Sequence, residues 1–321
     1  MKALFGAAII ALAAAWVYGP SLRGGWLWDD GLEVTGNPAL REAGGWWRPW
    51  AHPEGMDYFP LKSSLQWAEW RLWGASPEGY RAVNLALHVA SALLVWRLLA
   101  EMGVPGGFLA GLIFAVHPLA VESVAWISEF KNTLSLPPLL LSCIGFVRWE
   151  RSGSRRAWAL SLLFFLAALT CKTSVVALPA VLLIFLWWKR GALRSREWAA
   201  ASPFFAVALA LGAATVWFQS HRSIGIAGTP EGLAGRAAQA GWSLLCYAAA
   251  AAWPFGTEPV YPRAPAWVPA LLPWLLVAAM LGIFWGFRRA WGRHALLGSG
   301  WFFLNLVPVL GLVPMAYYRI S

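Results

Sequence analysis

The chain has 321 residues, of which 59% are apolar and 12% are charged, about half the charged share of an ordinary globular protein. Such a chain has too few polar side chains to cover a surface in water, and its mean hydropathy of +0.56 agrees. This composition excludes a soluble enzyme, a nucleic-acid-binding domain and a disordered chain, and it indicates an all-α polytopic membrane protein.

The predicted elements are apolar stretches close to the ~20 residues with which a helix crosses a bilayer. The first begins after Lys2, and Tyr18-Gly19-Pro20 is a poor signal-peptidase site, so we interpret it as an uncleaved helix. We expect about nine spans in a single membrane domain over 1–321, near residues 3–20, 80–100, 105–121, 133–148, 157–171, 174–188, 198–219, 267–287 and 295–315.

The charges favour one orientation of these spans. With the N-terminus in the cytoplasm, 13 basic and 3 acidic residues face the cytoplasm, and 12 of each face outward. The whole net charge of +10 then lies on the cytoplasmic side, as the positive-inside rule requires, and no nucleic acid is needed to explain it. This distribution holds only if 233–253 does not cross, so we expect a membrane-surface helix there, inside a second outer loop at 220–266.

Polar residues gather where the predicted spans reach the outer side. The first outer loop, 21–79, carries Trp26-Leu27-Trp28-Asp29-Asp30 and a stretch at 60–70 with helical spacing and an aromatic face. The shorter outer clusters are His117-Pro118 with Glu122, Glu129-Phe130-Lys131-Asn132, Lys172-Thr173-Ser174, Tyr261-Pro262-Arg263, and Arg319.

This distribution separates the classes of function. A secondary transporter needs ionisable groups near the bilayer midplane, and the predicted spans carry almost no charge there. Polar chemistry at the outer surface favours an enzyme that takes one substrate from the lipid and one from water. A transporter or flippase and a non-catalytic membrane assembly protein stay open as alternatives.

Several motifs occur in a fixed order: "WLWDDGLEVTGNP", "FPLKSSLQWAEWRLWG", "HPLAVESVAWISEFKNTLS", "TCKTSVVALPAVLLIFLWW", "VYPR" and "FFLNLVPVLGLVP". Together they resemble the membrane domain of the transmembrane-and-TPR-containing O-mannosyltransferases, a family of the GT-C glycosyltransferase superfamily. The resemblance spans nearly the whole chain and implies a GT-C-like helical bundle. It also implies a polyprenyl-phosphate-linked sugar donor, with mannose as the relatives' sugar, and a protein or glycan acceptor.

An acidic pair early in the first outer loop is the catalytic signature of that superfamily, and Asp29 and Asp30 match it. One carboxylate would take the proton of an acceptor hydroxyl as that hydroxyl attacks the anomeric carbon. The alternative is a capping box, because Asp30 and Glu33 have its spacing and Asp30 would then only begin a surface helix. No cofactor is indicated with certainty, and a divalent metal on the pair stays open.

The departing phosphate needs cationic partners. Lys131, Lys172, Arg263 and Arg319 are the candidates, and each has the alternative of a cation that only contacts lipid headgroups. His117, Glu122 and Asn132 are candidates to line the site, with His117 alternatively capping a span.

Two departures from the family pattern stand out. Many members carry Arg-Lys-Asp where this sequence has Phe130-Lys131-Asn132. We also find no TPR repeat, and the sequence stops at "MAYYRIS" where relatives continue, so we expect either a fragment or a degenerate member. Abundant Ala, Gly, Trp and Arg with few Lys indicate a GC-rich bacterial genome, which places the chain in the inner membrane with a periplasmic active site.

Overall fold

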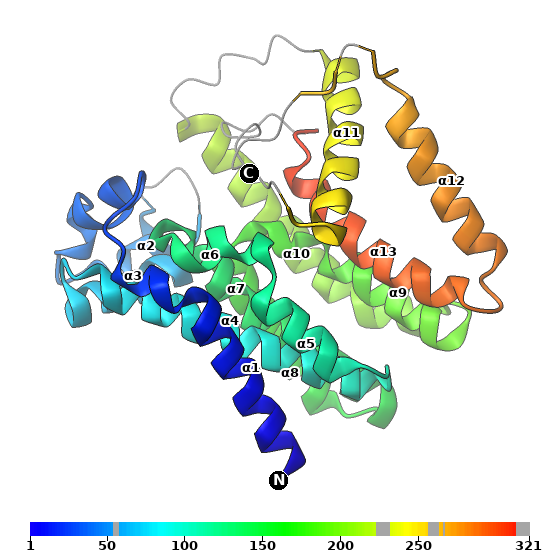
Figure 1. Cartoon of the computed structure of the whole chain (residues 1–321), viewed down its shortest axis with the longest axis horizontal. Coiled ribbons are helices and arrows are strands. Elements are labelled where there is room, and N and C mark those ends of the chain that lie inside the picture. The colour runs from blue at the N-terminus through cyan, green and yellow to red at the C-terminus, as the bar shows by residue number, and fades with distance from the viewer. Residues whose placement is uncertain (54–57, 223–231, 256–262, 266, 313–321) are drawn as a thin grey trace. The chain divides into compact units, whose positions relative to one another are not determined.

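The computed structural model describes residues 1–53, 58–222, 232–255, 263–265 and 267–312, and Figure 1 shows its arrangement of helices. The structure is 81% helical, and no strand occurs in these residues. The predicted all-α class of a polytopic membrane protein is therefore confirmed. The chain divides into two compact units, Met1–Val175 and Val176–Ser321.

The first unit consists of a long N-terminal helix, a set of short turns and short helices, and several further long apolar helices. Its α-helices are α1 (Lys2–Tyr18), α2 (Arg48–Ala51), α3 (Pro60–Trp73), α4 (Pro77–Met102), α5 (Gly107–Val116), α6 (Val121–Ala125), α7 (Phe130–Ser152) and α8 (Arg155–Cys171). Its short turns are η1 (Gly19–Arg23), η2 (Gly31–Thr35), η3 (Pro38–Leu40), η4 (Pro118–Ala120) and η5 (Ile127–Glu129), and η6 (Thr173–Ala177) leads into the second unit.

The second unit consists of five α-helices and one terminal turn among the residues that the structure describes. They are α9 (Leu178–Arg190), α10 (Ser195–Arg222), α11 (Leu233–Ala252), α12 (Leu272–Gly286), α13 (Gly292–Leu306) and η7 (Val307–Val309). The stretch predicted as a membrane-surface helix at 233–253 is thus helical as α11, and its position on the membrane surface stays a prediction.

The span predicted at 105–121 is broken. α5 ends at Val116, His117 takes an extended conformation, and the helical path resumes at Pro118 as η4 and α6, bent by 54° from α5. Pro118 explains the break, because proline disfavours helical backbone at the residue before it and has no N–H for the helical ladder. The segment is therefore one bent span or a re-entrant pair, not a straight helix.

By length and hydropathy, five helices in the described part of the chain are long and apolar enough to cross a membrane, and six if the bent pair counts as one span. α8 has 17 residues, and α12 and α13 have 15 each, which leaves them short of that criterion. The predicted count of nine spans is not confirmed.

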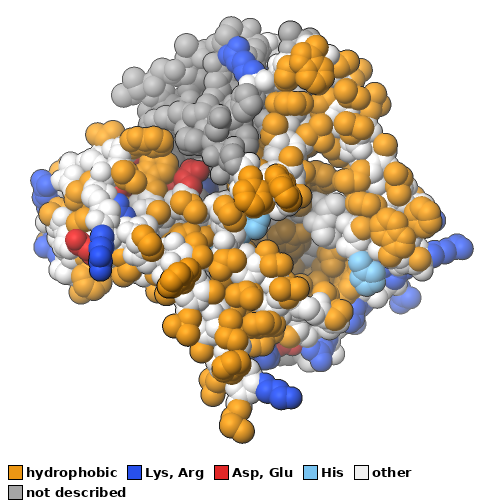
Figure 2. Space-filling model, viewed as in Figure 1, with side chains coloured by type: hydrophobic (Ala, Val, Ile, Leu, Met, Phe, Trp, Pro, Cys, Tyr) orange, Lys and Arg blue, Asp and Glu red, His pale blue; other side chains and the backbone are white. Residues whose placement is uncertain are grey.

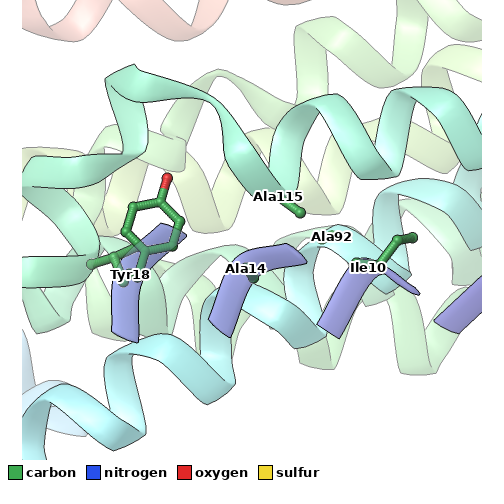
Figure 3. Packing of buried hydrophobic residues seen from close by; sticks show 6 residues of the cluster. Ile10, Ala14, Tyr18, Ala92 and Ala115 are labelled. Atoms are coloured by element: carbon green, nitrogen blue, oxygen red, sulfur yellow. The ribbon is translucent and has the colours of Figure 1, made fainter. Parts of the chain in front are cut away.

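Small residues bring α1, α4 and α5 together. Ala14, Ala92 and Ala115 are fully buried at this contact, beside Ile10 and Tyr18, as Figure 3 shows. A Cβ added at Gly111 of α5 would lie 2.8 Å from the carbonyl oxygen of Ala92, so the backbones approach too closely for any larger residue. Helices in lipid associate through such close contacts, because apolar side chains gain little by leaving a solvent that is itself apolar.

The other side of α1 carries large hydrophobic side chains that no described part of the chain covers. Leu4, Phe5, Leu12 and Trp16 are each at least 70% exposed. Figure 2 shows hydrophobic side chains over much of the viewed face of the helices. Such surfaces are stable in hydrocarbon, so they indicate lipid-facing helices.

Candidate functional site

The segment that precedes the acidic pair is bound to the start of α4 by one buried arginine. The side chain of Arg81 is 1% exposed, and its Nε donates to the carbonyl oxygen of Ala125 at 2.9 Å. Its Nη1 and Nη2 donate to the carbonyl oxygens of Gly24 and Gly25. Three backbone acceptors from two distant segments thus meet one guanidinium, which fixes the loop against α4 and the end of α6.

Asp30 fixes the same loop from its other end. Its side chain is fully buried, and Oδ2 accepts a hydrogen bond of 2.9 Å from the N–H of Leu27. Oδ1 accepts from both the N–H and the hydroxyl of Ser128 in η5, at 2.8 and 2.6 Å. The side chain makes no cap bond to the helical turn η2, so the capping-box interpretation of Asp30 is wrong. Its carboxylate is a buried acceptor that holds two segments together.

Asp29 has the opposite environment. Its side chain is exposed, while its carbonyl oxygen accepts from the N–H groups of Leu32 and Glu33 and so starts the turn η2. The preceding residue, Trp28, has a φ of +35°, the one positive φ outside glycine in the described ranges. Its ring contacts that of Trp126 edge-on at 5.2 Å. Strained backbone of this kind costs about 1–3 kcal/mol and concentrates at functional sites.

Glu33, one turn after Asp29, forms an ion pair with a lysine on α3. The Nζ of Lys62 lies 2.5 Å from Oε2 of Glu33, and the lysine is 6% exposed. This lysine lowers the pKa of the Glu33 carboxyl, and the charge of Lys131 adds to the effect despite the opposing cost of burial. The acidic turn therefore lies within electrostatic range of Lys131, one of the predicted phosphate-binding cations.

Lys131 and Lys172 are joined through the residues at the start of α7. The Nζ of Lys131 lies 3.0 Å from Oε1 of Glu129. Nδ2 of Asn132 donates to Oε2 of Glu129 and, at 3.1 Å, to Oγ of Ser123, while Oδ1 of Asn132 accepts from Nζ of Lys172. The two predicted cations and Asn132 therefore belong to one polar cluster.

The neighbouring residues of that cluster differ in their surroundings. Glu122 is exposed and lies within electrostatic range of Lys131 and Lys172. Phe130, which stands where many relatives have arginine, is buried against Leu134 and Cys171. The departure from the family motif at this position thus replaces a charge by a core contact.

His117 acts as a cap at the break between α5 and α6. Its Nδ1 accepts from the N–H of Leu119 at 3.3 Å, and its carbonyl oxygen accepts from the hydroxyl of Tyr18 at 3.0 Å. This geometry is the capping alternative stated for His117. The second unit holds Arg263, which is exposed, and Arg319 lies outside the described residues.

The divalent metal that the sequence left open finds no set of ligands. No group of three or more His, Cys, Asp or Glu side chains in the described part of the chain is arranged to hold an ion. Both oxygens of Asp30 already accept hydrogen bonds. The carboxylate of Asp30 is thus engaged by donors of the protein itself.

Sequence reasoning missed four residues of this site: Glu33, Lys62, Arg81 and Ser128. Glu33, Lys62 and Ser128 lie within the quoted motifs, and Arg81 lies between the second and the third of them. Which of these residues pair with one another does not follow from their spacing. Arg81 is 57 residues from Gly24, and Ser128 is 98 from Asp30. Only the fold brings these pairs together.

Comparison with known proteins shows which protein family the chain matches. The family model described as dolichyl-phosphate-mannose-protein mannosyltransferase matches residues 52–218. This range contains Lys62, Arg81, Lys131 and Lys172, and it begins after the acidic pair. No solved structure matches the chain.

Curated relatives carry the same kind of name. The chain is 31% identical over 198 residues to protein O-mannosyl-transferase Tmtc1 of Drosophila melanogaster, covering 55% of this chain and 22% of the relative. It is 28% identical over 192 residues to Tmtc2 of the same species, covering 53% and 20%. Protein O-mannosyl-transferase TMTC1 of Homo sapiens is 28% identical over 162 residues, covering 46% and 18%. The chain thus spans about a fifth of the length of these relatives.

Proposed function

Since the chain belongs to the dolichyl-phosphate-mannose-protein mannosyltransferase family, we propose that it is a membrane-embedded glycosyltransferase. It moves a sugar, mannose by analogy with the relatives' names, from a polyprenyl-phosphate carrier to a hydroxyl of a protein or glycan acceptor. The reaction takes place at the periplasmic face of a bacterial inner membrane. The observation that carries the proposal is an exposed carboxylate, Asp29, on a loop that buried polar contacts hold rigid.

Asp29 is the general base. It accepts the proton of the acceptor hydroxyl while that oxygen forms a bond to the anomeric carbon of the sugar. The bond from this carbon to the phosphate oxygen breaks at the same time, and the polyprenyl phosphate leaves with the electron pair. Attack opposite to the leaving group inverts the anomeric centre.

Asp30 and Arg81 are positioning residues. Arg81 binds the carbonyl oxygens of Gly24 and Gly25, which precede Asp29 in the chain. Asp30, which follows Asp29, binds Ser128 in the turn η5. The backbone on both sides of Asp29 is therefore fixed, so the carboxylate loses little freedom when the acceptor arrives. A reactive group needs this kind of support from residues that are themselves locked in place.

Lys131 and Lys172 supply charge for the leaving phosphate. They form one cluster with Asn132 and Glu129, and Lys131 also acts on Glu33 one turn from Asp29. Cations held near a leaving group stabilise the negative charge that develops on it. A transporter or flippase would need such charges along a path through the bilayer, whereas here they gather at the ends of helices.

The test is sugar transfer from radiolabelled polyprenyl-phosphate sugars in membranes that contain the chain. We expect Asp29→Asn to reduce transfer by at least about 10²-fold, the scale of general-base catalysis, at an unchanged level of folded protein. Lys131→Gln and Lys172→Gln reduce transfer less, because each removes one of two cations.

Glu42→Gln is the matched control, since Glu42 is another exposed acid of the same loop and pairs with Arg48 nearby. Full transfer by Asp29→Asn would overturn the assignment of the base. Transfer lost equally in Asp29→Asn and Glu42→Gln would indicate a general charge effect. A folded wild-type chain that transfers none of the sugars in the panel would favour the non-catalytic alternative.

A further inference from the structure

Three clusters of arginine and lysine side chains lie at those helix ends that the charge distribution predicts to face the cytoplasm. Two of the three clusters contain an acid. In the first unit, Glu101 pairs with Arg97, Arg148 and Arg151 at 2.6, 2.8 and 3.0 Å. In the second unit, Glu197 pairs with Arg190 and accepts from the N–H of Arg194. These clusters carry their own counter-charge.

The third cluster has no such acid. The end of α9 and the turn that leads from α12 into the start of α13 lie next to each other in Figure 1. They carry Lys189, Arg288, Arg289 and, in the first turn of α13, Arg293. None of the four pairs with an Asp or Glu among the residues that the structure describes. The first turn of α13 has no acid either. The positive end of the helix dipole lies at this turn and disfavours the cations beside it, so the cluster lacks a nearby negative charge.

These four cations surround a cavity of about 220 Å³, whose other lining residues are Trp188, Ala290 and His294. Lys189 and Arg289 are exposed, and nothing in the described part of the chain binds their side chains. The cavity is smaller than the roughly 300 Å³ at which sites for drug-sized ligands begin, so it suits a small group.

Aromatic contacts hold the frame of this cavity. The rings of Trp187 and Trp285 stack at 5.6 Å, and Arg288 lies over Trp285 at 4.7 Å. Nδ1 of His294 accepts from Nε1 of Trp188 at 3.1 Å, so the neutral ring carries its proton on Nε2 and can donate there. Nε of Arg293 is buried and has no hydrogen-bond partner in the described residues. These contacts position the lining side chains and leave Nε of Arg293 without an acceptor in the described residues.

We propose that this cavity, the basic cavity of α9 and α13, binds a phosphate group. Lysine and arginine are the side chains that recognise phosphate oxygens, and arginine does so through two parallel hydrogen bonds. The phosphate belongs either to an anionic lipid headgroup or to a soluble phosphate. The proposal is independent of glycosyl transfer, because all of these residues lie in the second unit and none belongs to the site around Asp29.

The test uses native mass spectrometry of the purified full chain, titrated with phosphatidylglycerol. The double variant Lys189→Gln/Arg289→Gln removes two cations that form no hydrogen bond or ion pair with another described residue. Arg155→Gln/Arg156→Gln, at the exposed start of α8, removes the same charge elsewhere on the predicted cytoplasmic side. We expect the first variant to bind phosphatidylglycerol roughly ten- to thirty-fold more weakly than wild type, and the second to bind like wild type.

Two further arms identify the source of the phosphate. If excess inorganic phosphate displaces phosphatidylglycerol from wild type, the cavity accepts soluble phosphate; if it does not, the ligand is a lipid headgroup. Equal loss of binding in both double variants would overturn the proposal, because it would reflect total charge. So would wild-type affinity in Lys189→Gln/Arg289→Gln. Thermal unfolding of both variants confirms that they are folded.

Discussion

At the residue scale, the two neighbouring aspartates have opposite surroundings. Asp30 is fully buried and accepts three hydrogen bonds, from Leu27 and from both donors of Ser128, whereas Asp29 is exposed. The roles that we assign to them, scaffold and base, follow from this difference. Each role has its own measurable effect.

Removing a buried acceptor leaves donors unsatisfied. We expect Asp30→Ala to lower the free energy of unfolding by about 1–3 kcal/mol, because the N–H groups of Leu27 and Ser128 lose their partner. Ser128→Ala, which keeps the backbone N–H, should cost about 1 kcal/mol. Thermal unfolding in detergent measures both. Asp29→Ala is the control and should unfold like wild type; an equal loss of stability in it would contradict the division of roles.

A second buried acid is expected to titrate at about pH 8. Glu69 on α3 is 6% exposed, and its Oε1 has no hydrogen-bond partner in the described part of the chain. Burial raises the pKa of this carboxyl to about 8, although the charge of Lys62 opposes the shift. Its protonated form is therefore the stable one in the fold.

The sign of the pH effect is set by that shift. Above the ordinary value of 4.5 the unfolded chain releases the proton of Glu69 while the folded chain keeps it, so this group lowers stability as pH rises from about 5 to about 8. Glu69→Gln, which resembles the protonated acid, removes this dependence, so its unfolding temperature should rise relative to wild type across that range. Unfolding curves at pH 5, 6.5 and 8 check this, with Glu42→Gln as the exposed control. Parallel curves for wild type and Glu69→Gln would contradict it.

At the scale of elements, the break between α5 and α6 depends on one cap. Nδ1 of His117 accepts from Leu119 at the start of η4. We expect His117→Ala to lower the free energy of unfolding by about 1 kcal/mol and His117→Asn to restore it, because asparagine is a good N-cap. Thermal unfolding measures the loss and the rescue.

Sugar transfer separates capping from a direct role of His117 in the site. A capping residue affects stability, so both His117 variants should keep wild-type transfer below their unfolding temperatures. Loss of transfer in His117→Asn at full stability would contradict this and would return His117 to the residues that line the site.

The sequence predicts elements much better than it predicts contacts between them. Apolar runs predict the long helices near 3–20, 80–100 and 133–148, and Pro118 signals the break that a count of spans overlooks. The sequence places Lys172 and Asn132 at the outer ends of predicted spans, but it does not pair them; the link forms because it joins the ends of two packed helices. The partnership of Asp30 and Ser128 was not predictable, because no local rule connects residues so far apart in the chain.

At the scale of the whole molecule, the distribution of charge predicts which side of the membrane each connection faces. Ala43 in the first outer loop and Ala192 between α9 and α10 are both exposed. We expect a membrane-impermeant maleimide to label Ala43→Cys in intact spheroplasts and to label Ala192→Cys only after lysis, in a chain where Cys246 is replaced by alanine. Labelling of Ala192→Cys from outside would contradict the predicted orientation.

The burial of Asp30 bears on how related sequences are compared. A chain that retains the second acid and has lost the first keeps what folds the loop and lacks what we assign to the chemistry. A search that scores the two acids as one motif would count such a chain as half conserved, although on this assignment it folds fully and lacks its general base. The two positions are therefore better scored separately: the second as a marker of architecture, the first as a marker of catalysis.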